Sequence, residues 1–319
     1  MSKVLISITS FSEHDSKARE MLEENNIELI SNKENIKLTE SKLLDLVSEC
    51  DAIIAGTEKI SEKVISSGKK LKIISRVGIG VDNIDLLSAK KNNVKVSYTP
   101  DVPAPYLAEM TIGIMLTMLR NLHISNLNMH RGIWSRYFGR SISNSTIGII
   151  GYGRIGKNIT NKIQSLTPKK ILIYDILSDI DLNEKNLEWA SLDRIYKECD
   201  LISIHLPLNS STYNLIKKED LLKMKSNAII INNSRGGIIN EESLYEVLKS
   251  GHLSGAAIDV FENEPYTGKL LEIDNCLLTA HMGSMSVECR SEMEIQAVED
   301  VIRCLKKQEL KNEVPKYES

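Results

Sequence analysis

The sequence has few cysteines, few prolines, no surplus of either charge and no long apolar run. Its 319 residues carry 40 Lys and Arg against 43 Asp and Glu, a formal net charge of −3. This balance argues against a nucleic acid or a membrane bound through bulk charge. The five cysteines are widely spaced and form no C-x-x-C pair, so neither a disulfide framework nor a metal site is predicted.

The apolar segments are short throughout the chain. The most apolar of them, residues 110–119, is much shorter than the ~20 residues that a membrane span needs. The N-terminus leads directly into an apolar segment and lacks the pattern of a signal peptide. A cytoplasmic protein that contacts no membrane is therefore expected.

The length and the residue pattern predict two α/β domains. A chain of 319 residues with 42% hydrophobic and 26% charged residues has the composition of a globular protein of about two domains. Short apolar strands alternate with helical patterns, which is typical of a parallel sheet covered on both faces. The expected strands are residues 4–8, 27–30, 51–55, 71–75 and 94–98, followed by 147–150, 170–174, 201–205, 228–232, 255–259 and 276–279.

A domain boundary is expected near residue 100. The segment Thr99–Pro105 holds three of the seven prolines and is predicted to be a linker, because proline interrupts helices and central strands. A long apolar helix is expected over residues 106–121, followed by a polar stretch over 123–140. Trp134 in that stretch could pack in the core or contact a second copy of the chain.

The segment Gly151-Tyr-Gly153-Arg-Ile-Gly156 indicates a dinucleotide-binding loop, because it follows an apolar strand and begins a helical pattern. The three glycines allow a tight turn, a close approach of the backbone to a pyrophosphate, and close packing of helix on strand. Asp175 ends the next strand, where a carboxylate accepts hydrogen bonds from ribose hydroxyls. Residues 176–178 contain no Arg for a 2′-phosphate, so NAD is favoured over NADP.

Three polar segments follow successive strands of the same predicted sheet and carry Arg235, Glu264 and His281. The carboxyl ends of parallel strands lie at one edge, so these residues could converge on one crevice. A guanidinium can grip a carboxylate, an imidazole can exchange a hydroxyl proton, and a carboxylate can orient that imidazole. Together they could carry out the oxidation of a 2-hydroxy acid. His205, which ends another strand, is interpreted as a structural residue on the cofactor side.

These motifs together resemble the D-isomer-specific 2-hydroxyacid dehydrogenase family. The resemblance extends to His205-Leu-Pro-Leu, Asn233-Ser-Arg235-Gly-Gly, Asp259-Val-Phe-Glu-Asn-Glu264-Pro, His281-Met-Gly-Ser284 and the segment from Arg76 to Asp85. That last segment is most similar to the phosphoglycerate dehydrogenase branch. The implied fold is two Rossmann-like or flavodoxin-like parallel-sheet domains with a cleft between them. Residues 1–100 with 288–319 would form the substrate domain and residues 101–287 the NAD-binding domain, which would also form a homodimer.

The resemblance also implies roles for individual residues. Arg235 would hold the substrate carboxylate and carbonyl, His281 would be the acid and base, and Glu264 its carboxylate partner. Asp259 would hydrogen-bond the nicotinamide carboxamide. The residues expected at the cofactor are Gly151, Gly153, Arg154, Ile155, Gly156, Asp175, Leu206, Pro207, Ser234, Asp259, Gly283 and Ser284. Those expected at the substrate are Arg76, Gly78 and Ile79.

The sequence leaves the substrate and one alternative function open. The phosphoglycerate dehydrogenase branch has an Arg for the substrate phosphate after its third strand, where this chain has Ala55-Gly-Thr-Glu-Lys59. Lys59 or Arg76 would have to replace it, so 3-phosphohydroxypyruvate, glyoxylate and hydroxypyruvate all remain candidates. The alternative is an NAD(H)-responsive binding protein without catalytic activity, since a fold does not determine function. An enzyme acting on formate or phosphite matches the surroundings of His281 less well.

Overall fold

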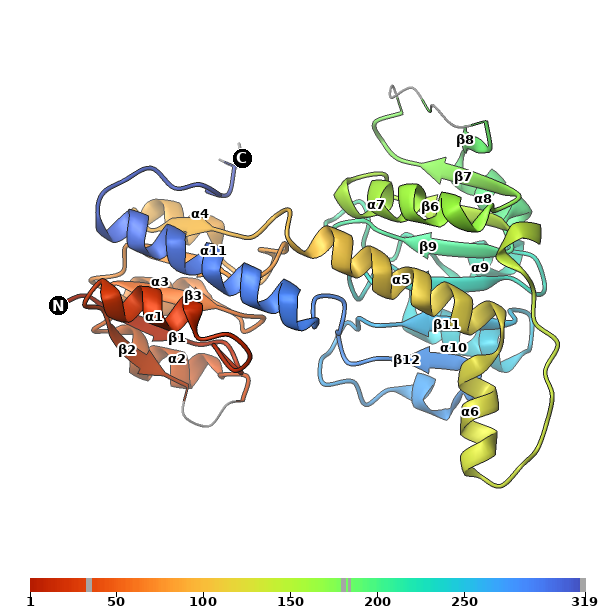
Figure 1. Ribbon diagram of the computed structural model, residues 1–319, viewed down its shortest axis with the longest axis horizontal. Helices are drawn as coiled ribbons and strands as arrows, with labels where there is room; N and C mark the ends of the chain where they lie inside the picture. Colours follow the sequence, from red (N-terminus) through yellow and green to blue (C-terminus); the bar gives the residue numbers. More distant parts are fainter. Residues whose placement is uncertain (33–35, 179–181, 183–184, 316–319) are drawn as a thin grey trace. The chain divides into compact units, whose positions relative to one another are not determined.

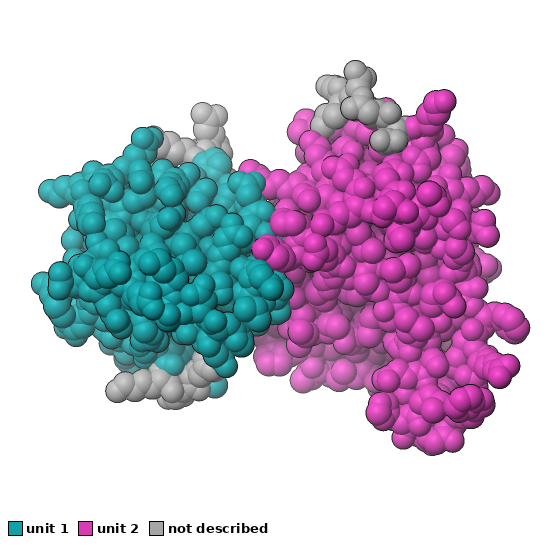
Figure 2. All heavy atoms as spheres, in the orientation of Figure 1, with its two compact units in different colours: residues 1–103, 284–319 teal, residues 104–283 magenta. Residues whose placement is uncertain are grey.

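The computed structural model describes residues 1–32, 36–178, 182 and 185–315. The chain forms two compact units, unit 1 from residues 1–103 and 284–319 and unit 2 from residues 104–283, coloured teal and magenta in Figure 2. Each unit is built on one parallel β-sheet with helices packed against it (Figure 1). The predicted fold class of two parallel-sheet α/β domains is confirmed.

Unit 1 contains a five-stranded sheet in the order β2-β1-β3-β4-β5, and all neighbouring strands pair in parallel. The strands are β1 (Lys3–Ile6), β2 (Glu28–Ser31), β3 (Ala52–Ala55), β4 (Ile73–Arg76) and β5 (Lys95–Ser97). The chain runs from β1 outward to β2 and then crosses back to β3 on the other side of β1. The order therefore reverses between β1 and β3, the place in such a sheet where ligands bind.

Helices cover the sheet of unit 1 on both faces, because its central strands are apolar along their whole length. Every residue of β3 and β4 is buried. The helices are α1 (Lys17–Glu24), α2 (Glu40–Val47), α3 (Glu62–Ser67), α4 (Leu86–Lys91) and α11 (Val287–Leu305). The last of these packs against α1 and β4, and the Ser75 hydroxyl donates to the Ala297 carbonyl at 3.0 Å. The C-terminal helix thus completes the core of a unit begun by the first hundred residues.

Unit 2 contains a seven-stranded parallel sheet in the order β12-β11-β10-β9-β6-β7-β8. The strands are β6 (Thr146–Ile150), β7 (Lys170–Tyr174), β8 (Leu187–Trp189), β9 (Leu201–Ile204), β10 (Ile229–Asn232), β11 (Gly255–Ile258) and β12 (Cys276–Leu278). The helices are α5 (Pro103–Leu119), α6 (Leu122–His130), α7 (Arg154–Ile163), α8 (Leu192–Glu198), α9 (Lys218–Lys223) and α10 (Glu241–Lys249). Here the strand order reverses between β6 and β9, so the glycine loop after β6 lies at this second reversal.

The core of unit 2 lies on both faces of its sheet, because alternate residues of each strand point to opposite faces. Ile149 and Ile173 pack on one face with Ile159 of α7. Ile150 and Leu172 pack in the cluster on the other face, which also includes residues of α8, α9 and α10. Two covered faces explain why the strands are apolar without alternation.

The proline-rich segment is shorter as a linker than predicted, because α5 already begins at Pro103 and includes Pro105. The prediction of a linker through residue 105 and a helix from 106 is therefore wrong at this end. Proline is tolerated in the first helical turn, where the missing N–H has no partner inside the helix in any case. Pro103 and Pro105 thus lie in the first turns of the helix, whereas Pro100 belongs to the segment before it.

Two elements of unit 2 are absent from the sequence prediction. The expected helix over 106–121 ends at Leu119, and α6 follows after Asn121, which has a left-handed φ of 54°. The short strand β8 pairs in parallel with β7. Three residues, Leu-Glu-Trp, are too few to show a periodicity.

A surface arm, residues 131–140, follows α6 and contains four exposed large apolar side chains: Ile133, Trp134, Tyr137 and Phe138. Trp134 is 78% exposed and Phe138 fully exposed, so core packing of Trp134 is the wrong alternative. Both ends of the arm are fixed to unit 2. Arg131 donates to Asp274 at 2.9 Å, and Arg140 donates to the Asn227 carbonyl at 2.6 Å and lies 3.3 Å from Asp200.

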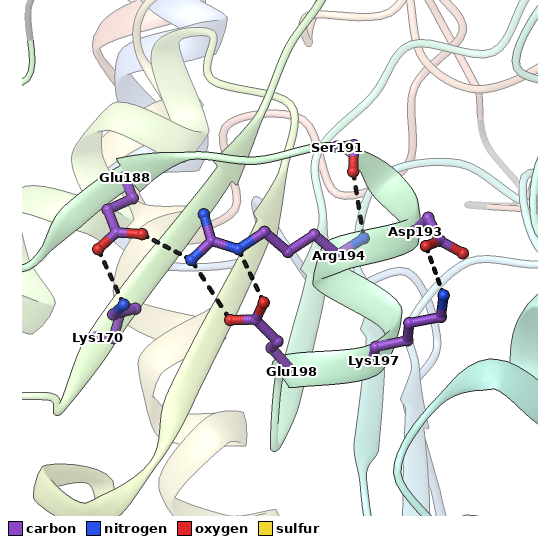
Figure 3. A network of polar contacts seen from close by, with 7 residues as sticks. All are labelled: Lys170, Glu188, Ser191, Asp193, Arg194, Lys197 and Glu198. Atoms are coloured by element: carbon purple, nitrogen blue, oxygen red, sulfur yellow. Dashed lines mark hydrogen bonds and ion pairs between the residues drawn. The ribbon is translucent and has the colours of Figure 1, made fainter.

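A charged network on the surface of unit 2 joins β7, β8 and α8, and Figure 3 shows its seven residues. Arg194 is its centre and lies 2.7 Å from Glu188 and 2.8 Å from Glu198. Lys170 binds the other oxygen of Glu188 at 2.9 Å, and hydrogen bonds from both cations lower the pKa of the Glu188 carboxyl. Because these side chains are partly exposed, solvent screens the pairs, and they add little to stability. Elsewhere in the described part of the chain, no helix is both long and apolar enough to cross a bilayer.

Candidate active site

His281 and Glu264 form a hydrogen-bonded pair in the loops that follow β12 and β11. The imidazole Nδ1 lies 3.0 Å from Oε2 and 3.2 Å from Oε1 of Glu264. Oε1 also accepts the Phe261 N–H at 3.2 Å, which fixes the carboxylate to its own loop. Since Nδ1 is directed at a carboxylate, Nε2 is the nitrogen left to exchange a proton with a ligand. The structure thus brings two of the three expected catalytic residues into direct contact.

Asp259 fixes the loop that carries His281. Its side chain is 1% exposed, and its Oδ1 accepts the N–H of Met282 at 2.7 Å and the Thr279 hydroxyl at 2.5 Å. Its Oδ2 accepts the N–H of Gly283 at 3.0 Å, and its backbone carbonyl accepts the N–H of His281 at 2.8 Å. These contacts restrain a loop in which His281 has a left-handed φ of 53°. The sequence pattern places Asp259 at the cofactor but does not reveal this restraint, although a buried acid that ends a strand often accepts backbone N–H groups.

Arg235 lies in the loop after β10, and Asn232 shapes that loop. The Asn232 amide donates to the Arg235 carbonyl at 2.8 Å and accepts the Ser234 hydroxyl at 2.8 Å and its N–H at 3.1 Å. The half-buried guanidinium of Arg235 donates from Nη1 to the Ser234 carbonyl at 2.7 Å. Gly236 allows this loop to pack on the next one, because a Cβ there would lie 2.0 Å from the Phe261 carbonyl carbon. The loops of Arg235 and Glu264 are therefore in contact.

The glycine loop after β6 has the geometry that a dinucleotide needs. Gly151 has a φ of +100°, and a Cβ there would lie 2.3 Å from the His205 carbonyl oxygen. A Cβ at Gly156 would lie 2.1 Å from the Gly151 carbonyl oxygen, so this glycine allows the helix to approach the loop. A Cβ at Gly153 would have no protein atom within 4 Å. The middle glycine thus borders open space at the N-terminus of α7, where backbone N–H groups can receive a pyrophosphate. This arrangement fits NAD.

Asp175 follows β7 and binds the backbone of the same loop. Its Oδ2 accepts the Tyr152 N–H at 2.6 Å, and its Oδ1 accepts the Leu177 N–H at 3.0 Å. The carboxylate is half-buried, while the side chains of Ile176 and Leu177 are exposed. Each carboxylate oxygen has two lone pairs, so both retain acceptor capacity for a ribose hydroxyl. The sequence pattern does not predict the link from Asp175 to Tyr152.

His205 lies beside the glycine loop at the end of β9. Its N–H donates to the Ile150 carbonyl at 2.7 Å, and its ring Nε2 is 2.8 Å from the Ser203 hydroxyl. Burial lowers the pKa of the imidazole to about 3. Among the described residues, the buried Nδ1 has no hydrogen-bond partner. A neutral imidazole with one nitrogen bound to Ser203 is consistent with the structural role expected for it.

The other expected cofactor residues follow the same strand ends. Arg154 and Ile155 begin α7, and the Leu206 side chain lies 3.2 Å from the ideal Cβ position of Gly151. The Pro207 carbonyl accepts the Thr212 hydroxyl at 2.6 Å. Gly283 is the last residue of unit 2, and Ser284 is the first residue of the C-terminal segment of unit 1.

The three expected substrate residues belong to unit 1 and follow β4. Arg76 is 9% exposed, and its Nη1 donates to the Val77 carbonyl. Gly78 has a φ of +146°, and a Cβ there would lie 2.6 Å from the Arg76 guanidinium. The Gly78 N–H donates to the Thr99 hydroxyl at 2.8 Å. Ile79 is half-buried in the same loop.

Two buried polar residues of unit 1, Ser7 and Glu58, are missed by sequence reasoning. Ser7 is 1% exposed and Glu58 2% exposed, and the Ser7 hydroxyl hydrogen-bonds the Glu58 carboxylate. The only signal for them is position, because each follows the end of an apolar strand.

Comparisons with known proteins agree with these features. Residues 112–283 match the family model described as "D-isomer specific 2-hydroxyacid dehydrogenase, NAD binding domain". A hydroxypyruvate reductase of Thermotoga maritima is 37% identical over 289 residues, covering 86% of this chain and 93% of that protein. A D-3-phosphoglycerate dehydrogenase of Synechocystis is 35% identical over 83% of this chain, which spans only 48% of that protein. The crystal structure of D-lactate dehydrogenase from Aquifex aeolicus, complexed with NAD and lactic acid, superposes with a TM-score of 0.86 at 25% identity and covers 99% of this chain and all of that one.

Proposed function

The chain belongs to the D-isomer-specific 2-hydroxyacid dehydrogenase family, a family of NAD-dependent oxidoreductases, and we propose that His281, Glu264 and Arg235 catalyse its reaction. The reaction interconverts a D-2-hydroxy acid and its 2-oxo acid. The observation that carries the residue assignment is the contact between His281 Nδ1 and the Glu264 carboxylate at 3.0 Å. That contact fixes the ring and leaves Nε2 for the substrate.

His281 moves the proton of the reaction. When the 2-oxo acid is reduced, Nε2 donates a proton to the oxygen that becomes the hydroxyl, and in oxidation Nε2 takes it back. Glu264 accepts the Nδ1 hydrogen and stabilises the protonated ring. The fork of Arg235 binds the substrate carboxylate and the carbonyl oxygen, on which negative charge develops.

The glycine loop and its neighbours hold the cofactor. Backbone N–H groups beside Gly153 bind the pyrophosphate, and Asp175 binds the adenosine ribose. Arg154, Ile155, Gly156, Leu206, Pro207, Ser234, Asp259, Gly283 and Ser284 line the rest of the cofactor, with Asp259 also restraining the His281 loop. The chemistry that bound NAD would supply is the exchange of a hydride with the C2 atom of the substrate.

Unit 1 is the substrate domain, with Arg76, Gly78 and Ile79 binding the acid, and unit 2 is the NAD-binding domain. The substrate is a small 2-oxo acid, such as the hydroxypyruvate or glyoxylate named for two relatives, or 3-phosphohydroxypyruvate, the oxidised form of the 3-phosphoglycerate named for a third. Unit 2 also forms a homodimer through the apolar arm, residues 131–140, whose four large side chains are exposed although its ends are fixed. The protein works in the reducing cytoplasm, which suits its five free cysteines.

The reaction is tested by following NADH consumption with glyoxylate, pyruvate, hydroxypyruvate and 3-phosphohydroxypyruvate. We expect at least one acid to be reduced to its D-2-hydroxy product. NADH binding without turnover on any of the four would instead favour an NAD(H)-responsive binding protein.

The residue assignment is tested with His281→Gln, which should abolish turnover and leave the dissociation constant of NADH nearly unchanged. The control is His14→Gln, because His14 is exposed in unit 1 and has no part in the proposed mechanism. Loss of NADH binding in His281→Gln without a specific loss of turnover would contradict the role of His281.

A further inference from the structure

Glu241 holds the loop that carries Glu264 from outside that loop. Glu241 begins α10, and its Oε1 accepts the N–H of Glu262 at 2.8 Å. Glu262 precedes Glu264 by two residues in the loop after β11. The hydrogen bond therefore acts on the backbone beside the carboxylate that contacts His281. All four residues belong to unit 2, so the arrangement does not involve unit 1.

The helix α10 is a firm support for this contact. Leu244 and Leu248 are buried in the apolar cluster on one face of the sheet of unit 2. Asn240 caps the helix, because its side chain accepts the Ser243 N–H at 2.9 Å. A carboxylate in the first turn, such as that of Glu241, is also stabilised by the helix dipole. The position of Glu241 is thus determined by the core and not by the loop that it holds.

The loop itself needs such a support. Residues 259–268 form neither helix nor strand. Two contacts make the loop compact, because Phe261 and Tyr266 stack with ring centroids 4.2 Å apart and the Phe261 N–H donates to Glu264. Both contacts join residues of the same loop, so neither orients it toward the imidazole. Packing against Gly236 limits where the loop lies, and the directional hydrogen bond from α10 sets its orientation.

The charges at this point show what holds Glu241 toward the loop. Burial raises the pKa of the Glu241 carboxyl, and the charges of Glu262 and Glu264 raise that pKa further. Like charges repel, so these two carboxylates do not attract Glu241. The N–H of Glu262 is the attractive contact, and it favours the ionised form of Glu241. A neutral acceptor of the same length could therefore replace the carboxylate.

We propose that Glu241 is a positioning residue that holds Glu264 against His281 through the N–H of Glu262. Its effect reaches the reaction only through Glu264, and it transfers no proton itself. The inference rests on the proposed function, because Glu264 and His281 are the pair that the proposed mechanism uses. It goes beyond that function by assigning the support of the pair to a residue of another element.

The first experiment compares Glu241→Ala, which removes the acceptor, with Glu241→Gln, which keeps an acceptor of the same length. Both are assayed with whichever of the four 2-oxo acids the unmodified protein reduces fastest. We expect kcat of Glu241→Ala to fall by about tenfold, because a shift of the loop misplaces Glu264, with KM and the dissociation constant of NADH changed by about twofold at most. Glu241→Gln should keep kcat within about twofold of the unmodified protein.

The matched control is Glu242→Ala, at the next residue of the same helix. The exposed carboxylate of Glu242 pairs with Lys269 at 2.6 Å, and exposed pairs of this kind contribute little. We expect kcat of this variant to equal that of the unmodified protein.

The second experiment adds Glu264→Ala to the unmodified protein and to Glu241→Ala. If Glu241 acts through Glu264, Glu241→Ala has little effect once the Glu264 carboxylate is absent, and the two substitutions are not additive. An equal fall in kcat in both backgrounds would show a general structural effect and overturn the inference. An unchanged kcat in folded Glu241→Ala, or a fall in Glu241→Gln as large as in Glu241→Ala, would overturn it too.

Thermal unfolding checks that each variant is folded. If Glu241→Ala is not folded, Glu241→Asp replaces it in both experiments, because an aspartate keeps the charge but is too short to reach the Glu262 N–H equally well. Failure of the proposed function gives a different result. The unmodified protein then reduces no acid, or Glu264→Ala keeps its full kcat, and the inference is refuted together with the proposed function.

Discussion

The Nδ1 atom of His281 lies within 3.2 Å of both carboxylate oxygens of Glu264. A carboxylate in this position orients the ring and stabilises its protonated form. The pair is held from two sides, because Asp259 binds the loop of His281 and the Phe261 N–H binds Glu264. Its geometry is therefore a property of unit 2 in the absence of any ligand.

Replacing the carboxylate should lower turnover more than it lowers substrate affinity. In Glu264→Gln the amide can still contact Nδ1, but the negative charge that stabilises the protonated ring is lost. We expect kcat to fall by about 10²-fold, the lower end of the range for general acid–base catalysis, with KM changing several-fold at most. Steady-state kinetics at several pH values measures this, and an unchanged kcat at every pH would contradict the role of Glu264.

The two glycines of the cofactor loop should respond differently to alanine. Gly153→Ala places a methyl group where no protein atom lies within 4 Å and where φ is −75°, so the folded protein should tolerate it. We expect an unfolding temperature close to that of the unmodified protein and NADH binding at least about tenfold weaker, since the methyl group would occupy the pyrophosphate position.

Gly156→Ala is the matched comparison for that variant. Its Cβ would lie 2.1 Å from the Gly151 carbonyl oxygen, so the helix or the loop must move and the unfolding temperature should fall clearly. Calorimetry and a fluorescence titration with NADH distinguish the two effects. Equal NADH affinity for Gly153→Ala and the unmodified protein would mean that the open space beside Gly153 does not receive the cofactor.

Burial of His205 should make the protein less stable in mild acid. The pKa of its imidazole is lowered to about 3 in the folded state, whereas the unfolded chain takes up the proton near pH 6.5. The unfolded state therefore binds more protons between these values, so stability is full above about pH 6.5 and falls as the pH decreases toward 3. The contribution reaches at most about 1.4 kcal/mol of unfolding free energy per pH unit.

Urea unfolding at pH 7, 6, 5 and 4 measures this dependence. His205→Gln should show a shallower loss of stability between pH 6 and 4 than the unmodified protein. His130→Gln, at an exposed position on α6, should keep the original slope. Parallel curves for the unmodified protein and His205→Gln would show that His205 does not contribute.

The arm should determine the oligomeric state. Trp134 and Phe138 are exposed although Arg131 and Arg140 fix the ends of their segment, and such an apolar patch is typical of an interface. We expect the unmodified protein to be a dimer in analytical ultracentrifugation and the double variant Trp134→Ser, Phe138→Ser to be largely monomeric. The control is Leu87→Ser, an exposed apolar residue of unit 1, which should remain a dimer.

Much of the fold is readable in the sequence because parallel strands buried on both faces are continuous apolar segments. The strands β3 and β10 are examples, since each of their residues is buried. The errors occur where the pattern is short or has two meanings. Pro103 could end an extended segment or begin a helix, and the three residues of β8 carry no period.

About as much of the candidate site as of the fold could be predicted from the sequence. The glycine loop and the residues after the strand ends could be predicted because their residue types rarely occur together at this spacing. Restraints such as Asp259 on Met282 or Asp175 on Tyr152 involve backbone N–H groups. Every residue except proline has one, so these restraints leave no mark in a sequence. The Ser7–Glu58 contact joins residues 51 positions apart, and only the parallel pairing of β1 with β3 shows that they meet.

The two contacts of Asp175 couple the choice of cofactor to the geometry of the glycine loop. The carboxylate proposed to choose between the two nicotinamide cofactors also holds the Tyr152 N–H, 2.6 Å away in the glycine loop. Exchanging Asp175 for a small neutral residue to admit a 2′-phosphate would therefore also release the turn that receives the pyrophosphate. A change of cofactor preference toward NADP would need a second substitution that restores an acceptor for the Tyr152 N–H. Substituting Asp175 alone should give a protein that binds both cofactors weakly.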